Sequence, residues 1–306
     1  VCAVVNGLKG ARIAMLGARP IAFNTVRYSE KLLQKHGISV QTIDFSEIIF
    51  KAMHYNDAEK VAAKIKEIRE YGSVPAWISD EVMEKQAKLC LVIDETIEDL
   101  QCDASTVQCW DSVENNYGCA TCLAMSMMGD NGKPSACESD VTGALSMLAA
   151  WLAAGTAPAL MDWNNNIREE RNACVSLHCS NFPKSFFQND VEIECLDVLG
   201  STLGKENCFG ACKGHVAAGD MTFIRLTTDD QRGTVKAYLG EGVFRDEVIP
   251  TKGGVANCYI ENLQNLLRYV CENGYEHHVC FVRGHVADIL EEALTKYMGI
   301  PVYRHR

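Results

Sequence analysis

The chain has 306 residues, of which 47% are apolar and 23% are charged, and its formal net charge at pH 7 is −11. This composition is ordinary for a folded protein and excludes a disordered chain. The length is sufficient for two domains with separate cores. No basic patch accompanies the acidic balance, and we therefore expect no nucleic-acid partner. An acidic protein can still bind a neutral small molecule.

The longest apolar stretch, residues 144–160, is interrupted by serine, glycine, threonine and proline, and we expect no membrane partner. No basic segment precedes an apolar run at the start, so no secretory signal is predicted. Many of the 15 cysteines lie inside apolar segments, as Cys90 and Cys280 do. This pattern favours reduced thiols in a cytoplasmic protein. The chain opens at Val1 without an initiator Met, and we expect it to come from the middle of a longer protein.

Two short motifs could point to other functions. Cys119 and Cys122 form a CxxC, but no second pair follows at zinc-finger spacing, so a dedicated structural zinc site is not the preferred interpretation. Gly7, Gly10 and Gly17 do not form a GxGxxG motif, and no acidic residue follows at the required distance. A Rossmann-type dehydrogenase is therefore disfavoured.

The first hundred residues alternate short apolar segments with helical patterns. Such alternation is typical of a βαβ layer with a parallel sheet, and we predict a Rossmann-like α/β domain over residues 1–105. We expect strands at 11–17 and 40–44 and helices at 25–36, 57–71 and 80–101, with a short strand possible at 89–93 inside the last of these.

A second domain is predicted over residues 106–306. The fold class is therefore α/β: a parallel-sheet βαβ domain followed by a mixed α/β catalytic domain with an antiparallel β-rich portion. A long helix over 140–154 has Ser139 or Asp140 as its N-cap, and the strand after it ends in Asp162. The other expected helices are 118–128, 260–272 and 287–298, and the other expected strands are 134–137, 157–161, 173–177, 221–226, 233–239 and 278–282.

Glu138, Asp162 and His278 are the leading candidates for chemistry. Two carboxylates at junctions between strands and helices lie where an open α/β layer presents its ligand face, and a neutral imidazole is a common metal ligand. An acid at a helix start can equally be only a cap or a dipole partner. His178 and His285 also follow strands and fit an ordinary half-buried histidine. Spacing alone leaves these alternatives open.

The residues around these candidates resemble the L-fucose and L-arabinose isomerase family. The segment from Ala136 to Asp162 is similar to the catalytic segment of L-fucose isomerase, with an acid before a small-residue helix, then Gly-Thr-Ala and a strand that ends in Asp. The segment from His277 to Asp288 resembles the one that supplies the metal-binding histidine, and His278 takes that position. The resemblance is specific from about Trp110 to the C-terminus and moderate over residues 10–100.

The resemblance implies a metal-dependent aldose–ketose isomerase, which moves a proton through a cis-enediol of an open-chain sugar such as a 6-deoxyhexose or a pentose. Glu138 and Asp162 would be catalytic and, with His278, would hold Mn²⁺, or Mg²⁺ or Co²⁺ in its place. His277 stands where the fucose enzymes have an asparagine that contacts the sugar. The substrate-binding residues implied are His277, His178, Gln108 and Trp110, with Trp110 as a core residue the alternative.

Family members carry a further N-terminal α/β domain, which in the fucose enzymes covers the site of a neighbouring subunit. Nothing in this sequence corresponds to that domain, so a non-catalytic sugar-binding or regulatory relative is the alternative hypothesis. All three metal positions are filled, which favours the enzyme. The partners implied are a small-molecule sugar and further copies of the chain in a trimer or hexamer. L-fucose, D-arabinose, L-arabinose and anionic 6-substituted sugars all remain open as substrates.

Overall fold

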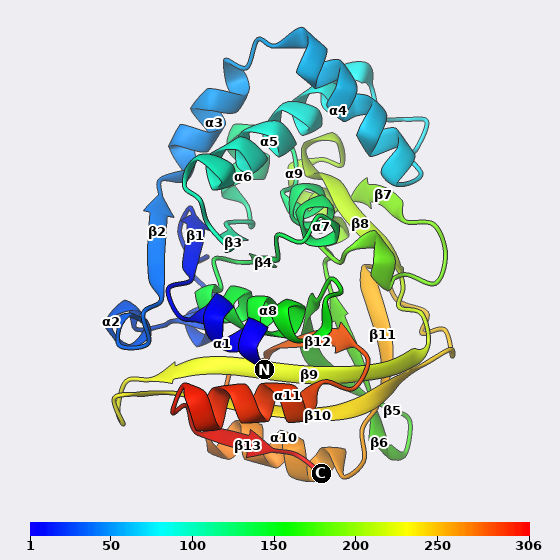
Figure 1. The fold of residues 1–306 in the computed structure, drawn as a ribbon. Coiled ribbons are helices and arrows are strands. Elements are labelled where there is room, and N and C mark those ends of the chain that lie inside the picture. The colour runs from blue at the N-terminus through cyan, green and yellow to red at the C-terminus, as the bar shows by residue number, and fades with distance from the viewer.

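The computed structural model describes residues 1–164 and 166–306. Its strands form a small sheet and a large one (Figure 1). The small sheet has four parallel strands in the order β2-β1-β3-β4, and its successive strands are joined through helices, as the sequence predicts. These strands are β1 (Arg12–Leu16), β2 (Ser39–Ile43), β3 (Ala104–Val107) and β4 (Ser135–Cys137).

Helices cover the small sheet from two sides (Figure 1). One group gathers at the top of that view: α3 (Phe45–Met53), α4 (Ala58–Tyr71), α5 (Asp80–Asp99), α6 (Ser112–Asn116) and α7 (Cys122–Asp130). On the other side, α8 (Val141–Ala154) lies between the two sheets and packs against β3, β4, β9 and β12. Two short helices, α1 (Cys2–Leu8) and α2 (Glu30–Gln34), flank the strands β1 and β2.

The large sheet has nine strands in the order β13-β10-β9-β12-β5-β6-β11-β8-β7, and most neighbours are antiparallel. A further pairing of β10 with β11 closes β10, β9, β12, β5, β6 and β11 into a ring. The strands are β5 (Ala159–Ile167), β6 (Glu170–His178), β7 (Glu192–Cys195), β8 (Phe209–His215), β9 (Gly219–Asp229), β10 (Thr234–Arg245), β11 (Gly254–Tyr259), β12 (His278–Arg283) and β13 (Val302–Arg304).

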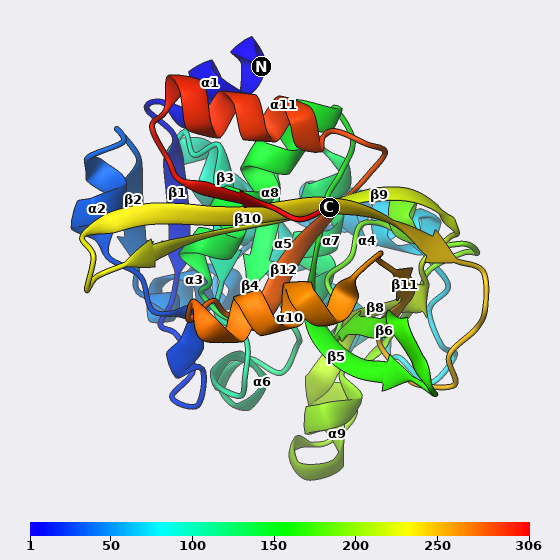
Figure 2. The same cartoon turned by 90° about the horizontal axis from the view of Figure 1, so that it is seen from below.

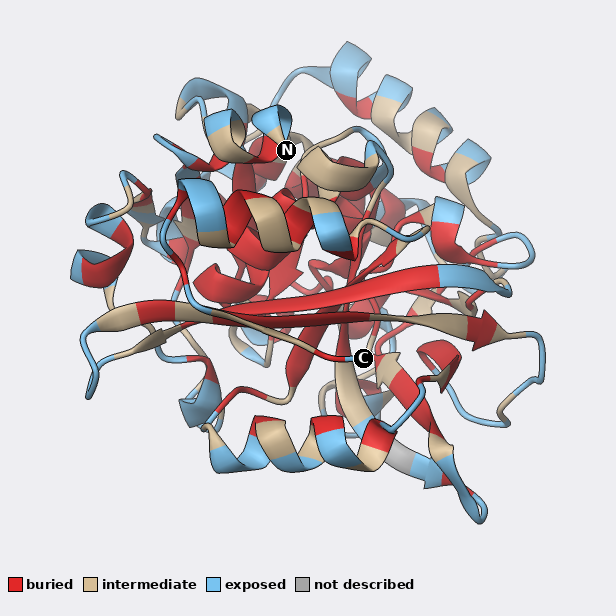
Figure 3. Ribbon diagram, turned by 60° about the horizontal axis from the view of Figure 1, so that its bottom comes forward, coloured by how far each residue is buried: buried red, intermediate tan, exposed pale blue. Residues whose placement is uncertain are grey.

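Three more helices belong to this half. α10 (Leu263–Glu272) and α11 (Ala287–Glu292) lie on opposite sides of the long β9–β10 hairpin, and α9 (Asp197–Leu203), which follows β7 in the chain, projects away from the sheet (Figure 2). Buried residues concentrate in the central strands and helices, while the outer helix faces are exposed (Figure 3). Helix α8 is buried on all sides from Val141 to Ala150, which is expected for a helix that is apolar all round.

The predicted fold class is confirmed, because a parallel sheet is combined with a separate antiparallel β-rich sheet. The domain boundary at residue 105 stays a prediction, and the small sheet takes strands from both sides of it. No strand interrupts 80–101: Ser79 caps one continuous helix, whose apolar residues recur at helical spacing along its buried face. The predicted helix over 25–36 is reduced to α2, which a 3₁₀ turn (Asn24–Val26) precedes.

The strand expected to end at Asp162 runs on to Ile167, because its partner β6 continues the ladder beyond that point. The strands β1, β2 and β4 and the helices α4 and α5 lie within a few residues of their expected places, whereas β3 and the helices α1, α3 and α6 were not expected. Every helix in the described part of the chain is too short or too polar to span a bilayer.

Candidate metal and sugar site

Strand pairing brings the predicted metal ligands together. In the antiparallel ladder of β5 and β12, Asp162 and His278 are direct partners. On the other side of β5, Asp162 pairs with Leu177, and His178 is the next residue of β6. Glu138 follows β4 at the carboxyl edge of the small sheet, which is where parallel sheets usually bind ligands. Side chains from both sheets therefore meet at one point.

The three predicted ligands are within contact distance of one another. Nε2 of His278 lies 3.1 Å from Oε2 of Glu138 and 3.5 Å from Oδ1 of Asp162. Nε2 of His178 lies 3.8 Å from the other carboxylate oxygen of Glu138. The side chains of Glu138, His178 and His278 are buried, whereas that of Asp162 is 25% exposed and marks the open side of the cluster.

The atoms that face the centre of this cluster have no hydrogen-bond partner. They are Oε2 of Glu138, Oδ1 of Asp162 and Nε2 of His278, and all three are buried. Buried polar atoms in native proteins are almost always satisfied, so three unsatisfied polar atoms that converge are unusual. A divalent cation accepts electron pairs from all three at once and offsets the repulsion between the two carboxylates. These residues therefore fit a metal ion.

The backbone at the end of β4 is unusual. Glu138 and Ser139 both have a left-handed conformation, with φ of 64° and 55°, which residues other than glycine adopt rarely and at functional sites more often. The two residues turn the chain from β4 into α8. Asp140 then caps α8, and its carboxylate accepts a hydrogen bond of 2.8 Å from the backbone N–H of Gly143.

Asp140 also fixes the orientation of His278. Its Oδ2 accepts from Nδ1 of His278 at 2.8 Å, so the other ring nitrogen is left to face Glu138 and Asp162. A carboxylate behind a histidine is the usual way in which proteins orient a metal-binding imidazole. Burial lowers the pKa of His278, but the carboxylates of Asp140 and Glu138 outweigh it and raise that pKa to about 10.

A fully buried arginine completes this network. Arg225 donates two hydrogen bonds to Asp140, of 2.6 and 2.9 Å, and a third of 3.1 Å to Glu276. Burial raises the pKa of Asp140, but Arg225 and His278 together hold it well below its usual range. The buried charges are therefore paired, as buried ions must be to persist.

Aromatic and polar residues form a wall beside the open side of the cluster. Nε2 of His277 lies 3.6 Å from Oδ1 of Asp162, and its Nδ1 lies 3.1 Å from the hydroxyl of Thr25. The ring of Phe23 is 6.3 Å from that of His277 and 5.6 Å from that of Trp110. Burial lowers the pKa of His277, and the charge of its neighbour His278 lowers it further. A neutral imidazole therefore stands next to Asp162.

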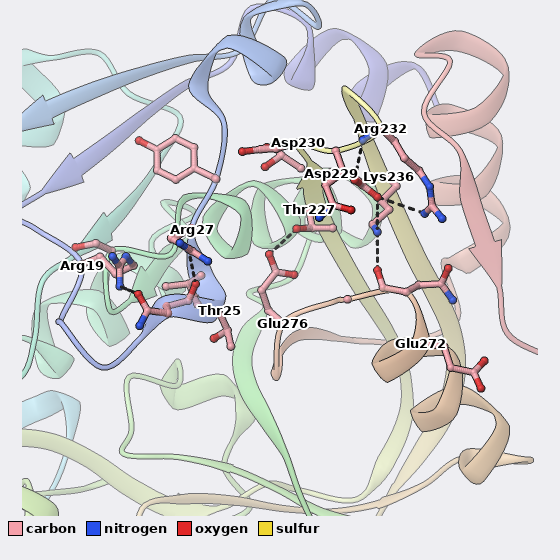
Figure 4. A pocket seen from close by; sticks show the side chains of 18 of the residues that line it. Arg19, Thr25, Arg27, Thr227, Asp229, Asp230, Arg232, Lys236, Glu272 and Glu276 are labelled. Carbon is pink, nitrogen blue, oxygen red and sulfur yellow. Dashed lines mark hydrogen bonds and ion pairs between the residues drawn. The ribbon is translucent and has the colours of Figure 1, made fainter.

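A cavity of about 940 Å³ lies next to this wall (Figure 4). Arg19, Thr25 and Arg27 lie on one side of it, and residues of the β9–β10 hairpin and Glu276 lie on the other. Ser139 also lines it, and the buried hydroxyl of this residue has no hydrogen-bond partner.

Two of the three arginines that line this cavity have no acidic partner among the described residues. Arg19 and Arg27 both bond to Asn24, at 3.3 and 3.0 Å. In the described ranges, neither guanidinium lies within 4.0 Å of a carboxylate. Lys236 and Arg232 on the facing side, by contrast, both pair with Asp229. The Arg19–Arg27 side therefore carries positive charge that no carboxylate in the described ranges neutralises.

Part of the chain matches a known protein family. Residues 176–306 match the model of the L-fucose isomerase C-terminal domain. The predicted resemblance to L-fucose isomerases is confirmed. The matched part of this isomerase-like chain includes His178, His277 and His278, and Glu138 and Asp162 lie before it.

Curated relatives align over nearly the whole chain. A sulfoquinovose isomerase of Priestia aryabhattai is 27% identical over 297 residues, which are 95% of this chain and 64% of the relative. Proteins of the same name from Alkalicoccus urumqiensis and Clostridium sp. strain MSTE9 are 24% and 27% identical and are covered over 66% and 63% of their lengths. The chain therefore spans a little under two thirds of the relatives that it matches.

The four predicted substrate-binding residues do not all lie at the metal cluster. His178 lies in the cluster, His277 lies at its rim, and Trp110 joins the rim through Phe23. Gln108 is turned elsewhere: its Oε1 accepts from the backbone N–H of Ala18 at 2.9 Å, and it lines a separate cavity of about 720 Å³. Sugar binding by these residues stays a prediction.

Sequence reasoning missed part of the site. Asp140 was expected only as a helix cap, and Arg225 was not singled out. An arginine within the apolar strand Met221–Leu226 was a usable signal, because a buried guanidinium requires acidic partners. No such pattern in the sequence points to Thr25, because only the fold brings this residue to His277.

Proposed function

We propose that this chain carries the active site of a metal-dependent aldose–ketose isomerase that acts on an open-chain sugar. The observation that carries the proposal is the convergence of Oε2 of Glu138, Oδ1 of Asp162 and Nε2 of His278, all buried and without partners. The names of the curated relatives support the same reaction class.

Glu138, Asp162 and His278 would hold the metal ion. Two carboxylate oxygens and one imidazole suit Mn²⁺, with Mg²⁺ or Co²⁺ as substitutes. The bound ion would act as a Lewis acid that polarises the sugar carbonyl and stabilises the charge that develops on its oxygen. Asp140 contributes by holding His278 in the tautomer that leaves Nε2 available.

The carboxylates of this chain also supply the proton transfer. Conversion of an aldose into a ketose moves a proton from C2 to C1, through a cis-enediol. One of Glu138 and Asp162 would remove the proton from C2 and return it at C1. The other would transfer the proton between O1 and O2. A positioned acid or base of this kind typically contributes roughly 10²–10⁴-fold to the rate. The neutral His277, held by Thr25, is placed to hydrogen-bond a sugar hydroxyl.

We further propose that the sugar carries an anionic substituent at the end remote from the carbonyl. Arg19 and Arg27 have no carboxylate partner and line the cavity next to His277 and Ser139. A guanidinium binds sulfonate or phosphate oxygens through paired N–H groups. The relatives are named for a sulfonated sugar, which favours a sulfonate. Neutral 6-deoxyhexoses and pentoses are the alternative substrates.

The reaction is tested by incubating the full chain with Mn²⁺ and a panel of aldoses in D₂O, with NMR detection of the ketose. Turnover with deuterium at C1 or C2 is expected, and Glu138→Gln or Asp162→Asn should abolish it without unfolding the protein. Arg232→Gln is the control, because this residue lies in the same cavity but pairs with Asp229. Mn²⁺ binding without turnover of any aldose would instead support a non-catalytic sugar-binding relative.

The substrate is tested by comparing a 6-sulfonated aldose with its neutral 6-deoxy counterpart. Arg19→Gln and Arg27→Gln should each lower kcat/KM for the sulfonated sugar by roughly 10- to 100-fold, the value of one charged hydrogen bond, and leave the neutral sugar unaffected. Equal losses for both sugars would contradict the anion assignment. Cytoplasmic location and assembly into a trimer or hexamer remain predictions.

A further inference from the structure

A group of cysteines lies directly behind Glu138. The sulfur atoms of Cys109 and Cys137 are 3.0 Å apart, and both residues are at most 1% exposed. Cys137 immediately precedes Glu138, and the two sulfurs and one Glu138 carboxylate oxygen all lie within 4.8 Å of one another. Cys122 is buried as well and lies near Cys137, but it is outside the group whose ligand atoms are all within 4.8 Å of one another. Two thiols and one carboxylate thus form a compact set, and a third thiol lies beside it.

We propose that Cys109, Cys137 and Glu138 form a second cation site, which binds a thiophilic divalent ion such as Zn²⁺ or Cd²⁺ and takes the neighbouring Cys122 as its fourth ligand on binding. Four ligands of this kind match the tetrahedral coordination that these ions take in proteins, and thiolates select them over Mn²⁺ or Mg²⁺. Tetrahedral Zn–S bonds of about 2.3 Å place two sulfurs roughly 3.8 Å apart. Binding therefore requires side-chain rotations that widen the 3.0 Å contact and bring Cys122 into the set.

Burial decides between this site and a redox-active cysteine pair. Reactive cysteines are partly exposed and stabilised as thiolates by positive neighbours, whereas all three of these residues are buried. A bound cation itself supplies the positive charge that makes a buried thiolate stable, and it deprotonates the thiol on binding. A metal ion therefore suits this set better than an oxidant does.

The two sites share one ligand. Oε2 of Glu138 faces His278, while the same carboxylate is also within reach of the sulfurs of Cys109 and Cys137. An ion held by the thiols would draw Glu138 away from His278 and Asp162. A thiophilic ion should then inhibit the isomerase by weakening its metal site, a consequence that rests on the proposed function. The binding itself does not rest on it.

Cadmium is the probe for the thiol site. Titration of Cd²⁺ into the full chain, in the presence of Mn²⁺, should produce the ultraviolet charge-transfer band of a cadmium thiolate. The ¹¹³Cd NMR shift of the wild type should report a site with three sulfurs and one oxygen, and this measurement needs no variant. Absence of the band, or a shift that indicates oxygen and nitrogen ligands only, would overturn the proposal.

Variants locate the site. Cys109→Ser and Cys109→Ala should each weaken Cd²⁺ binding at least tenfold and remove about one third of the band, one of three thiolates. Cys258→Ser is the matched control, because Cys258 faces Cys174 on the neighbouring strand in a second buried pair. Unchanged binding in the Cys109 variants, or an equal loss in Cys258→Ser, would also overturn it. These readouts remain valid if no sugar is turned over, so the two proposals fail separately.

Discussion

Two buried acids near the starts of helices differ in what surrounds them. Asp140 begins α8 and is fully buried, yet it is bonded to Arg225, to His278 and to the backbone of Gly143. Glu114 lies in α6, is 1% exposed, and has no hydrogen-bond partner for either carboxylate oxygen. Charge therefore stabilises the folded state at the first position and destabilises it at the second. Burial alone does not decide the sign of a carboxylate's contribution.

The largest effect is expected from Asp140→Asn. Asparagine can still accept from His278 and cap α8, but it leaves Arg225 with only Glu276 as a charged partner. We expect a loss of about 3 kcal/mol in the free energy of unfolding, measured by urea titration, since half of a buried ion pair is removed. Mn²⁺ affinity should fall about 10–100-fold through the less firmly held imidazole. If both the free energy of unfolding and the Mn²⁺ affinity of the variant equal those of the wild type, Asp140 does not have this role.

A change in pH dependence is expected from Glu114→Gln. Burial raises the pKa of Glu114 from 4.5 to about 7. The favourable contribution of the protonated form is complete below the unfolded pKa and is lost as the pH rises through 7, a difference of about 3 kcal/mol. Between pH 5 and pH 8, the wild type should therefore lose about that much more stability than the variant. Parallel pH profiles in urea unfolding would contradict this.

A smaller effect is expected from Gly143→Ala, which changes no charge. A Cβ at this position would lie 2.5 Å from Oδ2 of Asp140 and 3.1 Å from Nη1 of Arg225. The ion pair must shift to make room, and overpacking of this kind costs about 1–3 kcal/mol. Thermal unfolding of the variant measures it. A gain in stability, as alanine gives in an open helix, would show that the pair adjusts freely.

The smallest effect is expected from Arg232→Gln. Arg232 and Asp229 also form an arginine–carboxylate pair, with a separation of 3.3 Å, but the arginine side chain is 67% exposed. Pairs of this kind in water contribute little, so the free energy of unfolding should change by less than about 0.5 kcal/mol. A loss comparable to that of Asp140→Asn would mean that solvent exposure is not what separates the two pairs.

The network around Asp140 also shows what sequence could predict. Glu138, Asp162 and His278 were found because local motifs resemble a known family, and the structure brings them together. The pairing of Asp140 with Arg225 joins residues 85 positions apart, and no local pattern encodes it. Start and stop signals located α4 and α8 within a residue or two, because each helix has a capping Asp before it and a glycine after its last residue.

Short apolar runs were the weakest basis for prediction. The run in α5 fits a strand as well as a buried helix face, and length decides between them only when the caps are recognised. Strand β11 was not expected, although it joins β10 to β6. The closure of the ring depends on that strand, so the architecture of the second half could be predicted only as β-rich.

Closure of that ring has a consequence for how the protein can change during evolution. Side chains alternate between the two faces of a strand, so a slip of one residue would turn Asp162 or His278 to the opposite face. In a closed ring, every strand is paired on both sides, so a slip in one strand breaks its register with two neighbours at once. Insertions should therefore accumulate in the connecting loops. The pairing of Asp162 with His278 should be kept in relatives that act on other substrates.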